Sequence, residues 1–317
     1  MDIFDEKSIN PMLIKDQVAA FDSEDFIYEI KLDGIRCMAY LDSTGTDLRN
    51  KRDKKILQHV PELSCIYQQV NDKCILDGEL FVLKNGITDF YEIQRRILML
   101  DPFKIKLAAD RYPASFVAYD IIYYKDKLVN DLPLMERKEL LEKVINENNL
   151  ISISRYIETN GIHLFELAKQ NGLEGIVAKR KDSKYYFGKR TRDWLKCKVM
   201  DTIDCVICGY IKRGDNIAIL ILGQYDGESL IYKGHVSLGV GQRVFNHQKY
   251  NVVNNCPFGY VPKGNEDAVW LEPDLVCIVE SMPSEKDNFR QPVFKGIRND
   301  KTPLECNLIK GNNMESF

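Results

Sequence analysis

Six residues near the N-terminus, Lys31 to Arg36, constrain this chain more than any other feature. They read K-L-D-G-I-R, in which a lysine is followed within five residues by a carboxylate, a glycine and an arginine. Runs of apolar residues at 26–30 and 37–41 predict a β-strand on each side. The lysine therefore lies in a tight connection between strands, where a glycine lets a ligand approach the backbone. A lysine held in this way can act as a covalent nucleophile if its surroundings favour its neutral form.

Composition narrows the class of protein. The 317 residues suffice for one large or two ordinary domains, and 44% of them are apolar. No stretch approaches the apolar length of a membrane span, and residues 1–7 are acidic where a secretory signal would be apolar. Nine cysteines, an odd number without the spacing of a disulfide framework, are typical of reduced thiols. We therefore expect a cytoplasmic protein with no membrane partner.

The formal net charge of −3 conceals one strongly basic segment. Residues 179–198 contain nine Lys or Arg against two Asp, which leaves the rest of the chain at −10. Four aromatic residues lie among these charges: Tyr185, Tyr186, Phe187 and Trp194. A charge run by itself is usually a solvated face. Basic and aromatic residues together favour a surface that contacts nucleic-acid phosphates, and Arg190 and Arg192 are its central candidates.

Further motifs follow the lysine in a fixed order. They are L-D-G-E-L at 76–80, F-V-A-Y-D at 116–120, E-G-I-V-A-K-R at 174–180, W-L-K-C-K at 194–198 and R-N-D-K at 298–301. Together with the lysine motif they resemble the nucleotidyltransferase superfamily of ATP-dependent DNA ligases, RNA ligases and mRNA-capping enzymes. The third and fourth motifs, and P-L-M-E-R at 133–137, are most similar to the ligase module of bacterial end-joining DNA ligases.

The resemblance implies an α+β fold. A nucleotidyltransferase (adenylation) domain of antiparallel sheets with flanking helices would occupy residues 1–200, and an OB-fold β-barrel residues 201–317. Apolar periodicity predicts helices at 90–96, 133–146, 162–170 and 244–253, and barrel strands at 205–211, 217–222, 230–236 and 275–279. Gly209 interrupts the first of these strands, which indicates a bulge or a sharp bend.

The resemblance also implies roles for the charged residues. Lys31 would attack the α-phosphate of ATP, expel pyrophosphate and become a lysyl-AMP. Lys196 and Lys198, two apart on a predicted strand, share one face, and a triphosphate between them would offset the repulsion of like charges. Asp33 would act on the terminal hydroxyl.

Other residues are expected to hold the nucleotide and a metal ion. By resemblance Glu29 would accept a hydrogen bond from the adenine amino group through its side chain or backbone, and Tyr119 would stack on the base. Glu79 would touch the ribose or a metal ion, and Glu174 would bind the metal, which we expect to be Mg²⁺ or Mn²⁺.

Four basic residues are expected to contact phosphates. Arg36 and Arg49 would bind the phosphate of AMP and the 5′-phosphate of a nick, although Leu48 stands where the family has serine. Arg298 and Lys301 would orient the leaving pyrophosphate once the barrel closes over the nucleotide.

The predicted function is that of an ATP-dependent DNA ligase that seals nicks with 3′-OH and 5′-phosphate ends. The alternatives are an RNA ligase or capping-type nucleotidyltransferase, and a nucleic-acid-binding relative without activity. We expect a monomer from a bacterium or phage that binds nicked duplex DNA in repair, recombination or replication. A DNA-end-binding repair protein is a further candidate partner.

The basic segment generates a first prediction. The double substitution Arg190→Ala with Arg192→Ala should weaken binding to all DNA sequences, because phosphate contacts carry no sequence information. Each lost contact should reduce the slope of log K against log salt by about one unit. DNA binding measured at several salt concentrations checks this. Affinity that is unchanged at every concentration would mean that the segment is an ordinary solvated face.

Overall fold

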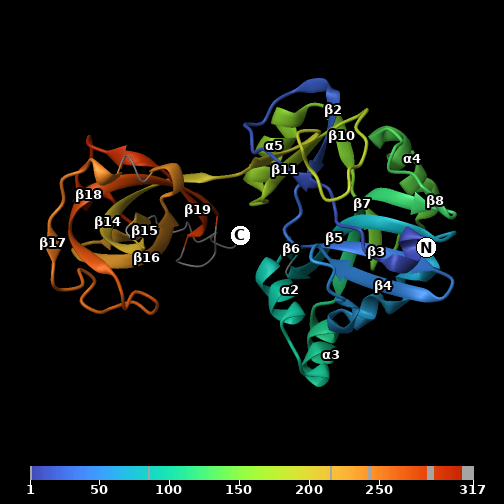
Figure 1. Cartoon of the computed structure of the whole chain (residues 1–317), viewed down its shortest axis with the longest axis horizontal. Coiled ribbons are helices and arrows are strands. Elements are labelled where there is room, and N and C mark those ends of the chain that lie inside the picture. The colour runs from blue at the N-terminus through green and yellow to red at the C-terminus, as the bar shows by residue number, and fades with distance from the viewer. Residues whose placement is uncertain (1, 85, 215, 242–244, 284–288, 309–317) are drawn as a thin grey trace, which may run out of the picture. The chain divides into compact units, whose positions relative to one another are not determined.

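The computed structural model describes residues 2–84, 86–214, 216–241, 245–283 and 289–308. The chain divides into two compact units, Met1–Val199 and Met200–Phe317 (Figure 1). The first is built from antiparallel sheets with flanking helices and the second is a β-barrel. The predicted α+β class is therefore confirmed.

Two sheets form the first unit. The smaller has the order β10-β2-β11-β13, with β2 at Ser23–Ile30, β10 at Tyr156–Thr159, β11 at Gly175–Arg180 and β13 at Trp194–Lys198. The larger has the order β4-β3-β5-β7-β8, with β6 beside β5 and β9 beside β7. Its strands are β3 (Ile35–Asp42), β4 (Gly45–Asn50), β5 (Cys74–Lys84), β6 (Ile87–Thr88), β7 (Ala114–Tyr124), β8 (Lys127–Leu128) and β9 (Ile151–Ile153). Two short strands, β1 (Leu13–Ile14) and β12 (Arg190–Thr191), pair in parallel.

Five α-helices are described in this unit. They are α1 (Ile3–Glu6), α2 (Phe90–Ile97), α3 (Pro102–Arg111), α4 (Leu134–Val144) and α5 (Gly161–Gln170). The 3-10 helices are η1 (Leu57–His59) and η2 (Pro61–Gln69), with η3 (Gly239–Gly241) and η4 (Pro303–Glu305) in the second unit. Three predicted helices, at 90–96, 133–146 and 162–170, are thus confirmed. No helix among the described residues is long and apolar enough to cross a membrane.

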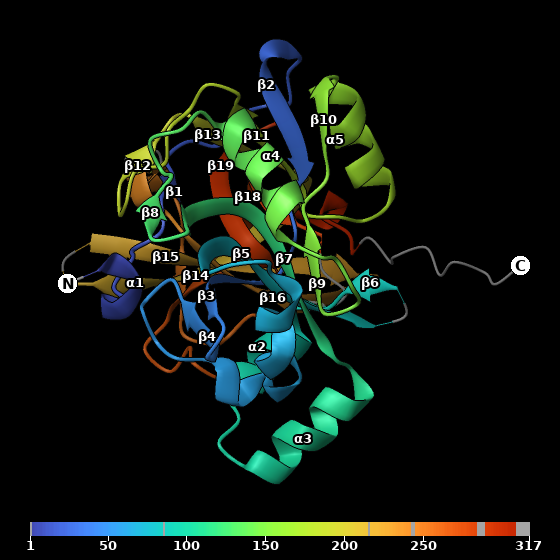
Figure 2. The same ribbon diagram turned by 90° about the vertical axis from the view of Figure 1, so that its right-hand side faces the viewer.

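The two sheets pack face to face around one core. Ile27 of β2, Met38 of β3, Ile75 of β5 and Trp194 of β13 belong to the same buried cluster. Because side chains alternate along a strand, the intervening residues point outward. On the smaller sheet they are covered by α5, which Figure 2 shows beside β10, and on the larger sheet by η2 and α4.

The Lys31 motif joins these two sheets. Residues 31–34 connect the end of β2 in the smaller sheet to the start of β3 in the larger one. Glu29 and Lys31 share the side of β2 that carries Ile27, which faces the space between the sheets. The fold therefore directs the lysine toward residues of both sheets.

The second unit is a curled sheet of the order β16-β15-β14-β18-β17, with β19 beside β18. Its strands are β14 (Asp201–Arg213), β15 (Asn216–Asp226), β16 (Ser229–Ser237), β17 (Val252–Val253), β18 (Val269–Met282) and β19 (Arg290–Arg298). β16 lies against β19, and Leu222 and Val279 are buried in the same cluster, so the sheet encloses its own core. The predicted barrel strands lie within β14, β15, β16 and β18, and a register shift before Gly209 confirms the bulge.

One predicted barrel element is wrong. Residue 244 lies outside the described residues, and within 245–253 only residues 245 and 246 are helical. Val252–Val253 instead forms β17, which pairs with β18 at Leu271 and Trp270. Phe245 stacks on Tyr250 with ring centroids 5.3 Å apart. Packing of these aromatic and apolar side chains on the barrel thus overrides the local helical spacing.

A buried ion pair fixes α4 against β7. Arg137 Nε and Nη2 donate to Asp120 Oδ1 and Oδ2 at 2.7 and 2.8 Å, and both side chains are fully buried. Arg137 Nη1 also donates to the carbonyl of Ser183 at 2.9 Å. These contacts hold together three segments that lie far apart in the sequence.

We therefore expect Arg137→Met to lower the free energy of unfolding by about 3–5 kcal/mol, because it leaves the Asp120 carboxylate buried without a partner. Arg95→Ala is the control, since it removes an ion pair in which Arg95 is largely exposed, and should cost about 1 kcal/mol or less. Urea unfolding curves measure both. Similar losses in the two variants would contradict the structural role of Arg137.

Candidate active site

Two glycines bring other strands close to Lys31. A Cβ on Gly34 would lie 2.2 Å from the carbonyl oxygen of Leu80, and one on Gly175 would lie 2.1 Å from that of Cys197. Only glycine is accommodated at such distances. The Lys31 N–H also donates to the Gly175 carbonyl at 2.9 Å. The backbone around the lysine is thus fixed by β5 on one side and by β11 and β13 on the other.

Glu174 lies between two of the predicted lysines. Its Oε2 is 2.6 Å from Lys31 Nζ and its Oε1 is 3.1 Å from Lys198 Nζ. The residue is 8% exposed and directly precedes β11. The structure thus brings the predicted metal ligand against the predicted nucleophile.

Lys196 adds a third cation to this group. It lies on the same face of β13 as Lys198. Burial lowers the pKa of Lys196, and the nearby charges of Lys198, Lys31 and Arg190 lower it further. Its Nζ makes no ion pair or hydrogen bond with any residue that the structure describes. Two lysines therefore pair with one carboxylate and a third lies near them, which is an arrangement suited to an anion.

Glu79 lies on β5, in the larger sheet. It is the cross-strand partner of Arg36 in the pairing of β5 with β3. Burial raises the pKa of Glu79 to about 8, even though the charges of Lys31 and Arg36 oppose this effect. Burial thus favours the neutral form of this carboxyl group. Among the described residues, no group of three or more His, Cys, Asp and Glu is arranged to hold a metal ion.

The two predicted phosphate-binding arginines are paired with carboxylates. Arg36 Nε and Nη2 donate to Asp77 Oδ1 and Oδ2 at 3.0 and 2.5 Å. Arg49, on β4, donates to Asp47 at 3.0 Å and to Asp53 at 2.9 Å. Arg36 lies beside Glu79, whereas Arg49 lies opposite Met38 on the edge strand. Their contacts with phosphates stay predictions.

Glu29 is held in a buried ion-pair network. It is 2% exposed, and its carboxylate pairs with Lys138 of α4 and with Lys179 of β11, the latter at 2.9 Å. Ser154 Oγ donates to Glu29 Oε2 at 2.8 Å. The contact of Glu29 with adenine, through its side chain or its backbone, stays a prediction.

Lys179 was assigned to the DNA-binding segment and is instead buried. It is 2% exposed, and its Nζ lies 4.2 Å from the ring centroid of Trp194 and 4.5 Å from that of Tyr119. Strand alternation could have indicated this, because Lys179 shares the inward face of β11 with Val177. Tyr119 is thereby placed between the sheets, with Trp194 edge-on at 6.1 Å. Its stacking on adenine stays a prediction.

The rest of the basic segment is largely exposed but partly neutralised. Five of its cations form ion pairs: Arg180 with Asp182, Lys181 with Glu158, Lys184 with Asp131, Arg192 with Asp16, and Lys198 with Glu174. Arg190 is exposed, and its Nη1 donates to the Ile14 carbonyl at 3.2 Å. The surface is therefore less basic than the sequence suggested.

The remaining predicted residues lie in two places. Asp33 lies in the same connection as Lys31. Arg298 ends β19 in the barrel, and Lys301 follows three residues later. Both of these cations contact Asp204, a residue that the sequence analysis did not single out.

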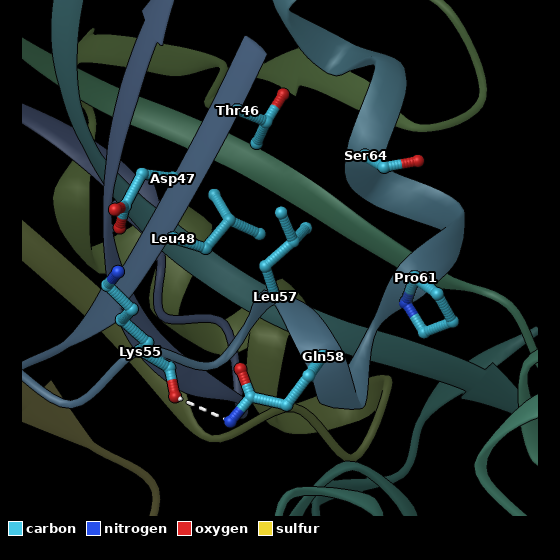
Figure 3. A pocket seen from close by; sticks show the side chains of 8 residues that line it. All are labelled: Thr46, Asp47, Leu48, Lys55, Leu57, Gln58, Pro61 and Ser64. Atoms are coloured by element: carbon cyan, nitrogen blue, oxygen red, sulfur yellow. Dashed lines mark hydrogen bonds between the residues drawn. The ribbon is translucent and has the colours of Figure 1, made fainter. Parts of the chain in front are cut away.

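A cavity of about 470 Å³ lies elsewhere in the first unit, between β4 and the 3-10 helices η1 and η2 (Figure 3). Its lining residues are Thr46, Asp47, Leu48, Lys55, Leu57, Gln58, Pro61 and Ser64. Gln58 Nε2 donates to the Lys55 carbonyl across one end at 3.1 Å. None of the predicted site residues lines it. The candidate site is therefore defined by converging charged side chains and not by this cavity.

Comparison with known proteins adds independent findings. A family model described as "ATP dependent DNA ligase domain" matches residues 8–198, and one described as "ATP dependent DNA ligase C terminal region" matches residues 213–301. DNA ligase C1 of Mycolicibacterium smegmatis is 31% identical over 334 residues, which cover 96% of this chain and 94% of that protein. A probable DNA ligase of Dictyoglomus turgidum is 30% identical over 275 residues, and the alignment covers 80% of this chain.

The fold also matches a solved structure. The ligase domain of LigD from M. tuberculosis aligns with a TM-score of 0.56 and 23% identity, covering 95% of this chain and 99% of that one. This likeness concerns the fold alone. The chain spans about half the length of the two probable ligases of Dictyoglomus, 47% and 55%.

The buried Lys179 generates a prediction on pH. Burial lowers its pKa to about 8, against the opposing charge of Glu29, whereas an unfolded chain titrates lysine near 10.4. Between these values the unfolded chain binds more protons, so the free energy of unfolding rises with pH. From pH 8 to pH 10, the free energy of unfolding of wild type should rise by on the order of 1–2 kcal/mol relative to that of Lys179→Met.

Urea unfolding at several pH values measures this difference. Lys189→Met is the control, because Lys189 is exposed. The free energy of unfolding of this variant should differ from that of wild type by the same amount at every pH. Parallel curves for wild type and Lys179→Met would show that Lys179 does not titrate as a buried group.

Proposed function

The chain belongs to the ATP-dependent DNA ligase family, and from this premise we propose that it seals nicks in duplex DNA with 3′-OH and 5′-phosphate ends. AMP would be transferred from ATP to Lys31, from Lys31 to the 5′-phosphate, and would be released when the 3′-OH attacks. The family model over residues 8–198 includes every proposed catalytic residue of the first unit.

The observation that carries this proposal is the group of Lys31, Lys196 and Lys198 around Glu174. Lys31 and Lys198 pair with the Glu174 carboxylate, and Lys196 lies close enough to the other two lysines for their charges to lower its pKa. The excess positive charge lies where the nucleophile is, between the two sheets. A polyphosphate would offset it, because lysine ammonium groups bind phosphate oxygens through charge-assisted hydrogen bonds.

Lys31 would supply the nucleophile in the first step. Its Nζ would form a bond to the α-phosphorus while the bond from that phosphorus to the bridging oxygen breaks, and pyrophosphate would leave. The nitrogen must first lose a proton, and Glu174 Oε2, 2.6 Å away, can accept it. Lys196 and Lys198 would stabilise the charge that develops on the phosphate oxygens.

Glu79 and Glu174 fit a Mg²⁺ or Mn²⁺ ion that is held mainly by the substrate. Glu174 adds to the rise in the pKa of Glu79, so the two carboxylates lie close enough to interact. Mg²⁺ sites commonly use one or two carboxylates together with phosphate oxygens and water. Such an ion would neutralise charge on the transferring phosphate.

Two further surfaces would take part. Arg298 and Lys301 of the barrel would orient the leaving pyrophosphate, which is needed only in the reaction with ATP. Arg190 and Arg192, both exposed, would contact the DNA backbone. Arg36 and Arg49 would bind phosphates of AMP and of the nick by exchanging their present carboxylate partners.

The covalent adduct tests the proposal directly. Wild type incubated with labelled ATP, GTP or NAD should retain label from ATP alone, and the adduct should then seal a nicked DNA duplex. Lys31→Ala should form no adduct, because Lys31 is the proposed attacking group. Lys143→Ala, which changes an exposed lysine on α4, is the control and should react normally. Label retained by Lys31→Ala, or a preference for GTP or NAD, would contradict this function.

A further inference from the structure

A four-residue charged cluster lies on the barrel. Arg298 Nη1 lies 3.0 Å from both Oδ1 and Oδ2 of Asp204, and Lys301 Nζ pairs with Oδ2. Arg298 also donates to Asp300, from Nε at 2.9 Å and from Nη2 at 2.8 Å. All four residues belong to the second unit, so the cluster is a property of the barrel itself.

Strand pairing explains why Asp204 lies at this point. β14 and β19 flank β18 on opposite sides. Asp204 is paired with Ile278, and Arg298 with Val276, two residues earlier on β18. The carboxylate and the guanidinium therefore meet across the central strand. The two ends of the barrel sequence, which are 94 residues apart, are joined by this contact.

The cluster leaves donors unused on both cations. The side chain of Asp204 is 16% exposed, and those of Arg298 and Lys301 are 30% and 28% exposed. Hydrogen bonds from Lys301 and Arg298 lower the pKa of Asp204 in spite of its burial, so the carboxylate is charged at neutral pH. An arginine has five N–H donors and a lysine three, more than Asp204 and Asp300 accept here.

Two neighbouring cations repel each other unless an anion lies between them. Asp204 accepts from both, so it keeps the guanidinium and the ammonium side by side without covering them. Asp300 pairs with Arg298 but not with Lys301 in any contact described, so it does not hold the two cations side by side. Asp204 is thus the common anchor of the two cations.

We propose that Asp204 is a positioning residue that holds Arg298 and Lys301 together for the pyrophosphate of ATP. The inference rests on the proposed function, because it assigns these cations to the reaction with ATP. It adds a residue that would touch neither ATP nor DNA and would act through the two basic side chains.

The test separates the reaction with ATP from the sealing step. Asp204→Asn should slow single-turnover formation of the Lys31 adduct about 10- to 100-fold, since displaced catalytic groups lose rates of this order. Sealing of a nick that already carries AMP should stay within about twofold of wild type, because pyrophosphate has left before that step. Arg298→Ala and Lys301→Ala should show the same division.

A matched control lies on β18 and β19, which also carry strand partners of the cluster. Glu280 of β18 pairs with Lys295 of β19 at 2.9 Å, and Glu280→Gln removes a carboxylate partner of a β19 cation without touching Arg298. This variant should react like wild type in both assays. Equal slowing of adduct formation by Glu280→Gln and Asp204→Asn would overturn the inference, since any lost ion pair would then suffice.

A double-mutant cycle provides the second readout. If Asp204 acts through the two cations, Asp204→Asn should have no further effect on adduct formation in a chain that already carries Arg298→Ala and Lys301→Ala. Additive losses would overturn the inference, as would equal losses in adduct formation and sealing. If Asp204→Asn does not fold, Asp204→Ser takes its place with the same expected results.

The two proposals fail in different ways. Wild type that forms no adduct with ATP would refute the proposed function. Wild type that reacts normally, together with Asp204 variants that react equally fast, would refute the role of Asp204 alone.

Discussion

The placement of Lys31, the proposed nucleophile, depends on a buried carboxylate two residues before it. Glu29 neutralises Lys138 of α4 and Lys179 of β11 in the space between the sheets, where an unpaired charge would be strongly unfavourable. Because Glu29 and Lys31 share one face of β2, this pairing also fixes the direction of the lysine. One ion-pair network thus connects the packing of the sheets to the geometry of the site.

Burial and neighbouring charges set the ionisation of the groups around Lys31. Glu174 is paired on both oxygens, Glu79 is shifted toward its neutral form, and Lys196 lies beside two other cations. The burial of Glu79 and the nearness of Lys196 to other cations are unfavourable in the isolated protein. Together they create an excess of positive charge at a point reached from both sheets. Functional sites commonly concentrate perturbed groups in this way, because the ligand supplies the missing charge.

The barrel also pairs one carboxylate with two cations, but there the side chains are more exposed to water. Asp204 forms ion pairs with two cations, as Glu174 does. The side chains of its cluster are partly exposed and belong to the second compact unit. Partial exposure leaves donors free for a ligand, whereas the buried pair of Arg137 with Asp120 has a structural role. Ion pairs of similar geometry therefore differ in function according to how much water reaches them.

Local patterns in the sequence determined much of this protein. The strands on either side of Lys31, the helices α2, α4 and α5, the barrel strands and the bulge at Gly209 all follow from residue periodicity and glycine placement. The shared face of Lys196 and Lys198 also follows, because alternation along a strand needs no tertiary contact. These features depend on neighbours within a few residues.

The tertiary structure alone decided which charges meet. Glu29 is bound by Lys138 and Lys179, which lie more than a hundred residues away in the sequence. Lys179 reads as one more cation in a basic run, yet the second sheet buries it against Tyr119. The predicted helix over 244–253 gives way to β17, and Asp204 pairs with Arg298, 94 residues away. Electrostatic environment and burial are set by segments that are distant in the sequence, which local patterns do not encode.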